Sequence, residues 1–183
     1  HQGVLLEMQS IKLMNERDFK DWCEQGDIPK LLLIVDGMTD PRNLGACLRS
    51  ANAAGVDAVL LPKRRIAPLS STVMRVAQGG CEELSLVELG NIARTLKWLR
   101  ERGVWIIGAD AGGGSIWESN LDNRPVALVV GDEGKGLRRL TIELCDEMVG
   151  IPMFGTVESL NVSVATGVLL FEVRRKTALT PKA

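Results

Sequence analysis

The chain has 183 residues, of which 45% are hydrophobic and 25% are charged, as is usual for one soluble globular domain. Its 22 basic and 23 acidic residues leave a net charge of -1, so overall charge does not indicate a nucleic-acid partner. No apolar run is long enough to span a membrane, and no stretch resembles a signal peptide. The single histidine, His1, argues against Ser-His-Asp and Cys-His catalysis and against most metal sites.

The cysteines indicate a reducing compartment. The chain has four, at positions far apart and without a C-x-x-C motif: Cys23, Cys47, Cys81 and Cys145. This spacing is typical of buried thiols rather than of disulfides or a zinc site. We therefore expect a cytoplasmic protein with no bound metal and no membrane contact.

Stretches with the pattern of buried strands alternate with stretches of helical pattern. A leading segment, His1–Lys12, precedes a short helix, Glu16–Gln25, that Asn15 caps. The predicted strands are Leu31–Val35, Ala58–Leu61, Leu84–Val87, Val104–Ala109, Val126–Val130 and Met148–Ile151. The predicted later helices are Asn43–Ala54, Ser70–Gln78, Leu89–Arg102, Leu137–Cys145 and Val162–Val173.

This alternation predicts an α/β fold with a largely parallel sheet flanked by helices, in one domain over residues 1–183. Ligands bind beyond the carboxyl ends of the strands in such sheets. Three polar loops that follow strands are therefore expected to converge: Asp36–Asn43, Gly131–Gly136 and Pro152–Asn161. The triple glycine Gly112–Gly114 is predicted to be a flexible loop.

The stretch Ile151–Phe171 joins a polar loop to an apolar helix. Val162–Val173 is apolar on nearly every face, which predicts a helix buried on all sides. A polar loop anchored on such a helix is how a rigid scaffold presents a binding loop. The alternative is a plain loop before a core helix.

The glycine-rich turn Gly131–Gly136 suggests a ligand close to the backbone, although a tight turn is an equal alternative. Neither G-x-G-x-x-G nor a P-loop motif is present, which disfavours a dinucleotide-binding or nucleoside-triphosphate site. Arg49, Lys63-Arg64-Arg65 and Arg138-Arg139 are candidates for phosphate contacts or, equally, for solvated charged edges.

Three motifs, in order, carry a resemblance to a known family. They are Asn43–Gly55, Leu128–Leu137, and Ile151–Met153 with Ser159–Ala165. The chain resembles the SpoU/TrmH family of RNA ribose 2′-O-methyltransferases, in the SPOUT superfamily. Asp36-Gly37, Thr39-Asp40-Pro41 and the third motif are most similar to the bacterial subgroup that methylates a guanosine ribose in large-subunit ribosomal RNA. One departure is Asp132, where relatives often carry Asn or Ala.

The resemblance implies a C-terminal trefoil knot, S-adenosyl-L-methionine as methyl donor, a ribosomal RNA substrate, and a homodimer whose active site uses both subunits. Members of this subgroup often carry an N-terminal RNA-binding domain, which this chain is expected to lack. Gly131, Ile151 and Leu160 match the positions that contact the donor through their backbone, whereas Asn43, Arg49, Glu133, Ser159 and Asn161 match the catalytic and substrate-binding set.

Methyl transfer to a hydroxyl depends mainly on positioning, and the hydroxyl must lose a proton. Arginine stays protonated, so Arg49 is expected to hold a phosphate and stabilise the forming alkoxide, with proton removal by water or by Glu133. A tRNA substrate, a non-catalytic RNA-binding or assembly module on the same fold, and a small-molecule nucleotide enzyme of doubly wound fold are the alternatives. The intact Asn43, Arg49 and Asn161 count against the second, and the missing phosphate motifs count against the third.

Overall fold

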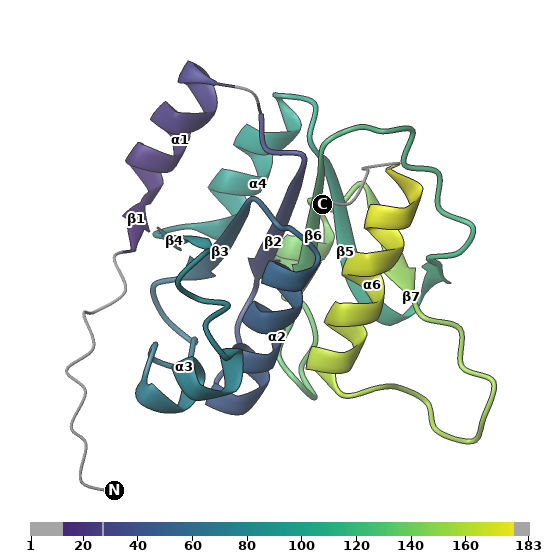
Figure 1. Cartoon of the computed structure of the whole chain (residues 1–183). Helices are drawn as coiled ribbons and strands as arrows, with labels where there is room; N and C mark the ends of the chain where they lie inside the picture. Colours follow the sequence, from purple (N-terminus) through teal and green to yellow (C-terminus); the bar gives the residue numbers. More distant parts are fainter. Residues whose placement is uncertain (1–12, 27, 178–183) are drawn as a thin grey trace, which may run out of the picture.

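The computed structural model describes residues 13–26 and 28–177. In these residues one parallel sheet has the strand order β1-β4-β3-β2-β6-β5-β7 (Figure 1). The strands are β1 Met14–Asn15, β2 Leu31–Val35, β3 Ala58–Pro62, β4 Ser85–Leu89, β5 Trp105–Ser115, β6 Val126–Val130 and β7 Glu147–Gly150. The predicted α/β class with a parallel sheet is confirmed. The leading segment His1–Lys12 lies outside the described residues.

Helices cover both faces of the sheet. They are α1 Glu16–Gln25, α2 Pro41–Ala53, α3 Ser71–Ala77, α4 Ile92–Arg100, α5 Arg139–Ile142 and α6 Val162–Lys176. Helices α2, α3 and α6 pack on one face through one apolar core, and α1 and α4 pack on the other face through a second (Figure 1). Helix α1 has the predicted bounds, and Asn15 caps it by accepting a hydrogen bond from the Asp18 backbone.

The position of the central strands in the sheet explains why their sequences are continuously apolar. All five residues of β2 are buried, and they alternate between the two cores. Leu31, Leu33 and Val35 belong to the core under α2 and α6, whereas Leu32 and Ile34 belong to the core under α1 and α4. A strand covered on both faces needs apolar side chains at every position, because successive side chains point to opposite faces.

Several predicted boundaries are wrong, mostly because a polar side chain caps a helix elsewhere. Helix α2 begins at Pro41, since Asp40 accepts a hydrogen bond from the Arg42 backbone at 2.7 Å. Leu89 belongs to β4, and α4 begins after its cap, Asn91. The helix predicted at 137–145 is only the single turn α5.

The triple glycine is not a flexible loop but the far end of β5. Gly114 pairs with Val149 of β7 after a register shift that follows Ala109. A Cβ on Gly113 would lie 2.7 Å from the Val149 backbone, so only glycine permits this close approach of two strands. The glycines therefore let β5 continue alongside β7.

Helix α6 is not buried on every face of the single chain, contrary to the prediction. Leu169, Leu170 and Val173 face the core, but Val164 and Phe171 are 52% and 53% exposed. One side of α6 packs against α2 (Figure 1), and the other side is open. The trefoil knot implied by the family resemblance stays a prediction.

Candidate active site

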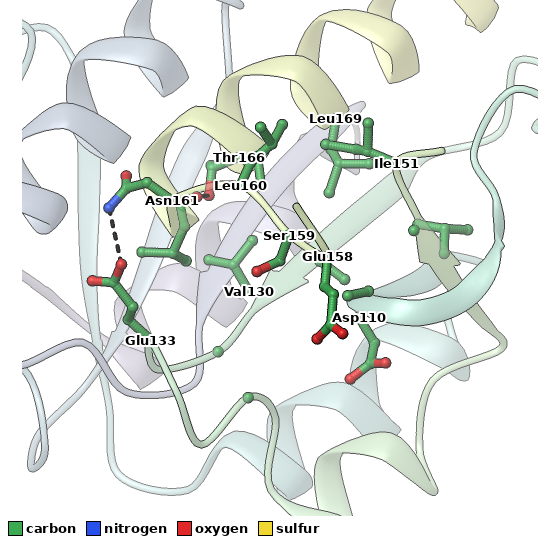
Figure 2. A pocket seen from close by; sticks show the side chains of 18 of the residues that line it. Asp110, Val130, Glu133, Ile151, Glu158, Ser159, Leu160, Asn161, Thr166 and Leu169 are labelled. Carbon is green, nitrogen blue, oxygen red and sulfur yellow. Dashed lines mark hydrogen bonds between the residues drawn. The ribbon is translucent and has the colours of Figure 1, made fainter. Parts of the chain in front are cut away.

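Three loops that are far apart in the sequence meet at the carboxyl edge of the sheet, as predicted. Asn43 lies in the first turn of α2, Glu133 follows β6, and Asn161 precedes α6. The Asn43 Nδ2 donates to Glu133 Oε2 at 2.6 Å, and the Asn161 Nδ2 donates to Asn43 Oδ1 at 3.0 Å. The same Asn161 Nδ2 donates to Glu133 Oε1 at 3.1 Å (Figure 2). One residue from each loop thus forms a closed polar network.

The orientation of Asn161 is set by its place at the start of α6. Its Oδ1 accepts hydrogen bonds from the Ser163 backbone at 3.0 Å and from the Ser163 hydroxyl at 2.6 Å. The amide nitrogen is then turned toward Glu133, because the oxygen is used as the helix cap. Both oxygens of Glu133 accept an amide hydrogen bond, so two side-chain amides hold this carboxylate in one position.

A cavity of about 540 Å³ lies beside this network (Figure 2). The middle of β5, the ends of β6 and β7, the turn after β6, the loop before α6 and the first turns of α6 form its walls. Six of the eight predicted site residues line it: Gly131, Ile151 and Leu160 of the donor set, and Glu133, Ser159 and Asn161 of the catalytic set.

The other two predicted residues do not line the cavity. Asn43 is 7% exposed and reaches the cavity only through its hydrogen bonds to Glu133 and Asn161. Arg49 is exposed on α2, nearly two turns further along the helix. The single chain therefore does not bring Arg49 together with the rest of the predicted site.

Gly131 is required by the turn that it begins. A Cβ there would lie 2.3 Å from the Gly136 carbonyl carbon and 2.6 Å from the Leu137 nitrogen. The turn is closed by two backbone hydrogen bonds between Asp132 and Gly136, at 3.2 and 2.9 Å. Of the two explanations that the sequence left open for this glycine, close approach of a ligand and a tight turn, the structure shows the tight turn, because the other end of the turn occupies the space.

The charge of the cavity is one-sided. Its lining includes the four carboxylates Asp110, Asp132, Glu133 and Glu158 and, among the residues that the structure describes, no lysine or arginine. A cavity of this kind favours a cationic ligand and disfavours phosphate groups. Asp110 was missed by the sequence reasoning, although a polar residue directly after a predicted strand is a usable signal.

A second missed feature is an ion pair at the same edge. Asp36, which follows β2, has a fully buried side chain. It accepts hydrogen bonds from the Arg138 backbone at 3.1 Å, from Arg138 Nε at 2.5 Å and from Arg138 Nη2. Because Arg138 follows the Gly131–Gly136 turn, this pair fixes the turn to the end of the central strand.

Three of the four thiols are buried, as predicted. Cys23, Cys47 and Cys81 are buried and Cys145 is half-buried, all as free thiols. Burial raises the pKa of each to about 11, so they are protonated and unreactive near neutral pH. Across residues 13–26 and 28–177, no cluster of three or more His, Cys, Asp or Glu side chains is suited to a metal ion. Nor is any helix of that part long and apolar enough to cross a membrane.

A search against protein-family models matches residues 30–171 to the SpoU rRNA Methylase family. The chain belongs to the SpoU rRNA methylase family. The match runs from β2 through most of α6 and so includes the network, the cavity and the Asp36–Arg138 pair. The predicted family is thereby confirmed.

Curated and solved SpoU proteins support the same assignment. The chain is 49% identical over 177 residues to the 23S rRNA (guanosine-2'-O-)-methyltransferase RlmB of Vibrio parahaemolyticus, covering 96% of this chain and 71% of that protein. A putative TrmH-family RNA methyltransferase from Porphyromonas gingivalis has a TM-score of 0.75 at 35% identity, over 81% of this chain and 60% of its own. The SpoU methyltransferase AviRb of Streptomyces viridochromogenes, solved with AdoMet, has a TM-score of 0.73 at 27% identity, over 81% of this chain and 61% of its own.

Proposed function

We propose that this chain methylates the ribose 2′-hydroxyl of a guanosine in large-subunit (23S-type) ribosomal RNA, with S-adenosyl-L-methionine as the methyl donor. Family membership and the similarity to a 23S rRNA guanosine methyltransferase support the reaction and the substrate. The structural observation that supports this methyl donor is the acidic cavity beside the Asn43–Glu133–Asn161 network.

The cavity residues fit this donor chemically. S-adenosyl-L-methionine supplies an activated methyl group on a positively charged sulfonium and carries no phosphate. Four carboxylates attract such a cation, and a volume of about 540 Å³ suits a ligand of this size. Gly131, Ile151 and Leu160 lie in the cavity wall, where backbone groups of the turn and of the loop before α6 are available to hold the adenosine and methionine parts.

The polar network serves the accepting hydroxyl. Glu133 is held by two amide donors and lies in the cavity wall, so it is available to accept the proton that the 2′-hydroxyl loses, directly or through water. Ser159 contributes a hydroxyl group to the same wall. Asn43 and Asn161 act by orienting Glu133.

The enzyme acts as a homodimer. The open side of α6 carries the exposed Val164 and Phe171, and burying that side against a second copy removes them from water. Arg49 does not line the donor cavity of its own chain, so its predicted role with phosphate and alkoxide requires that it reach the donor cavity of the second copy.

We place the enzyme in the cytoplasm with ribosomal RNA, and treat residues 1–183 as one catalytic domain.

The test of function is direct. The purified chain, labelled S-adenosyl-L-methionine and a large-subunit ribosomal RNA fragment are expected to give 2′-O-methylguanosine. Mapping of ribose methylation in cells that lack the protein should show one lost site in that RNA. Transfer only to tRNA would contradict the ribosomal substrate, and donor binding without transfer to any RNA would indicate a non-catalytic module.

The dimer is tested separately by sedimentation at micromolar concentration. Phe171→Asp is expected to give monomers that still bind the donor but do not transfer methyl groups, whereas Leu140→Asp changes an equally exposed apolar residue outside α6 and is expected to stay dimeric. A fully active monomer would contradict the shared active site.

A further inference from the structure

A second cavity, of about 650 Å³, lies at the same edge of the sheet but beside α4. The ends of β3 and β4, the first turn of α4 and the start of α5 form its walls. Its lining includes four cationic side chains and, within the described part of the chain, no carboxylate; the cations are Lys63, Arg64, Arg65 and Arg138. We call it the basic cavity.

Two of these cations are free to bind a ligand. Lys63 lies 3.9 Å from Glu88, and Arg138 binds Asp36. Arg64 and Arg65 are exposed and form no ion pair with any residue that the structure describes. The two unpaired arginines are neighbours in the chain and repel each other, and a bound anion relieves that repulsion.

The backbone that carries Arg64 and Arg65 is held on both sides. The Lys63 backbone N–H donates to the Leu89 carbonyl at 3.0 Å, and the Arg65 carbonyl accepts from the Met38 backbone N–H at 2.9 Å. Arg65 itself has φ of +63°, a conformation that costs a residue with a side chain about 1 kcal/mol or more. The surrounding hydrogen bonds enforce this conformation, so the loop presents its arginines from a fixed backbone.

The start of α4 adds to the positive potential. Asn91, Ile92 and Ala93 line the basic cavity, so the N-terminal end of the nine-residue helix α4 lies in its wall. The side chain of Asn91 accepts from the Arg94 nitrogen at 3.0 Å and caps one of these groups. The N-terminal end of a helix carries a partial positive charge and favours anions.

We propose that the basic cavity binds backbone phosphates of the RNA substrate, away from the nucleotide that is methylated. This inference rests on the proposed function, because RNA is the polyanion that this site has to accommodate. The donor cavity has no cation in its described wall, so phosphates of a bound RNA strand need a partner elsewhere on the edge. Arg138 follows by two residues Gly136, which lines the donor cavity, so one short segment borders both cavities.

The test uses a double variant, Arg64→Gln with Arg65→Asn, in the chain as it stands. Asparagine is chosen for position 65 because it tolerates the left-handed backbone conformation. The matched control is Arg17→Gln, which removes one exposed arginine of α1 that lines neither cavity. Affinity for a ribosomal RNA fragment is measured at several salt concentrations, and donor affinity is measured by calorimetry.

The double variant is expected to bind RNA roughly tenfold more weakly at low salt, and the slope of log K against log salt is expected to fall by about 1.4, as for two lost single-strand phosphate contacts. Donor affinity is expected to stay unchanged, and Arg17→Gln is expected to change neither quantity. If the unaltered chain binds RNA and the double variant matches the control, the basic cavity is not the phosphate site, while the proposed function stands. If the unaltered chain binds the donor but no ribosomal RNA, the proposed function and this inference both fail.

Discussion

The two cavities at the carboxyl edge of this sheet are opposite in charge, although the same topology builds both. The cavity beside α6 is lined by four carboxylates, and the cavity beside α4 is lined by four cations. A parallel sheet brings the loops after all its strands to one edge, but each loop brings its own charges. The near-zero net charge of the chain therefore conceals two local fields, one suited to a sulfonium and one to phosphates.

The two cavities also differ in how they are built. The donor cavity depends on the close approach of backbone segments, seen at Gly150 and in the turn that Gly131 begins. The basic cavity depends on long side chains extending from a backbone fixed by hydrogen bonds. Substitutions that add bulk should therefore damage the first cavity most, and substitutions that remove charge should damage the second.

The largest effect is expected from bulk in the donor cavity. Gly131→Val is expected to abolish measurable donor binding, because even its Cβ would lie 2.3 Å from the Gly136 carbonyl carbon and the turn must open. Leu160→Met, in the same wall, is expected to bind the donor almost as the unaltered chain does. Calorimetry measures both, and circular dichroism checks that each variant is folded. Equal affinity in the two variants would contradict this location of the donor.

Arg49, which lies in neither cavity of its own chain, provides the next test. Arg49→Ala is expected to lower the rate of methyl transfer by roughly 10²-fold or more, as for the loss of one hydrogen-bond donor to the transition state. The affinity for the methyl donor is expected to stay nearly unchanged, because Arg49 does not line the donor cavity of its own chain. Arg49→Lys is expected to restore little, because the planar guanidinium is lost. Single-turnover transfer gives the rate; full activity with lysine would mean that charge alone matters.

The wall of the basic cavity is supported from outside by Glu16 of α1. Glu16 accepts hydrogen bonds from Lys20, from Arg94 and from the backbone of Gly90, which lines that cavity. Burial acts to raise the Glu16 pKa, but the hydrogen bonds and charges of Lys20 and Arg94 outweigh it and hold the pKa below the ordinary value of 4.5. The ionised form is thus favoured by folding.

The contribution of ionised Glu16 to the free energy of unfolding is complete above pH 4.5, the ordinary pKa. It is lost as the pH falls through the lower pKa that Glu16 has in the folded state. Glu16→Gln is expected to lower that free energy by about 1 kcal/mol at neutral pH, with a difference that shrinks below pH 4.5. Denaturant unfolding at a series of pH values measures it. Asp21→Asn, at an exposed ion pair on the same helix, is the control and is expected to have little effect.

The smallest effect is expected from charge in the donor cavity. Asp110→Asn keeps the oxygen that accepts the Gly112 hydrogen bond at 2.8 Å and removes one exposed charge. Donor affinity is expected to fall roughly two- to threefold at low salt and less at high salt, because exposed charges are screened. Asp122→Asn, at an exposed carboxylate outside both cavities, is the control. No change with salt would mean that charge does not select the donor.

Local sequence pattern was a good guide wherever one segment decides its own structure. The strands Leu31–Val35 and Val126–Val130 and the helix Glu16–Gln25 have the predicted bounds, because continuous apolar runs and a capping side chain are local signals. The same reasoning failed at Gly112–Gly114, where glycine was taken as flexibility although the neighbouring strand requires it. It also failed at α6, whose apolar side is open in the single chain.

The sequence by itself determined the fold class, the family motifs and the convergence of three loops, since these follow from strand–helix alternation and from the residues in order along the chain. Only the tertiary structure decided which side chains meet: Asn43 with Glu133, 90 residues apart, and Arg138 with Asp36, 102 residues apart. Such contacts depend on how strands from the whole chain are ordered in the sheet, and no short window of sequence contains that order. For the same reason, the separation of acidic and basic side chains into two cavities appears only after folding.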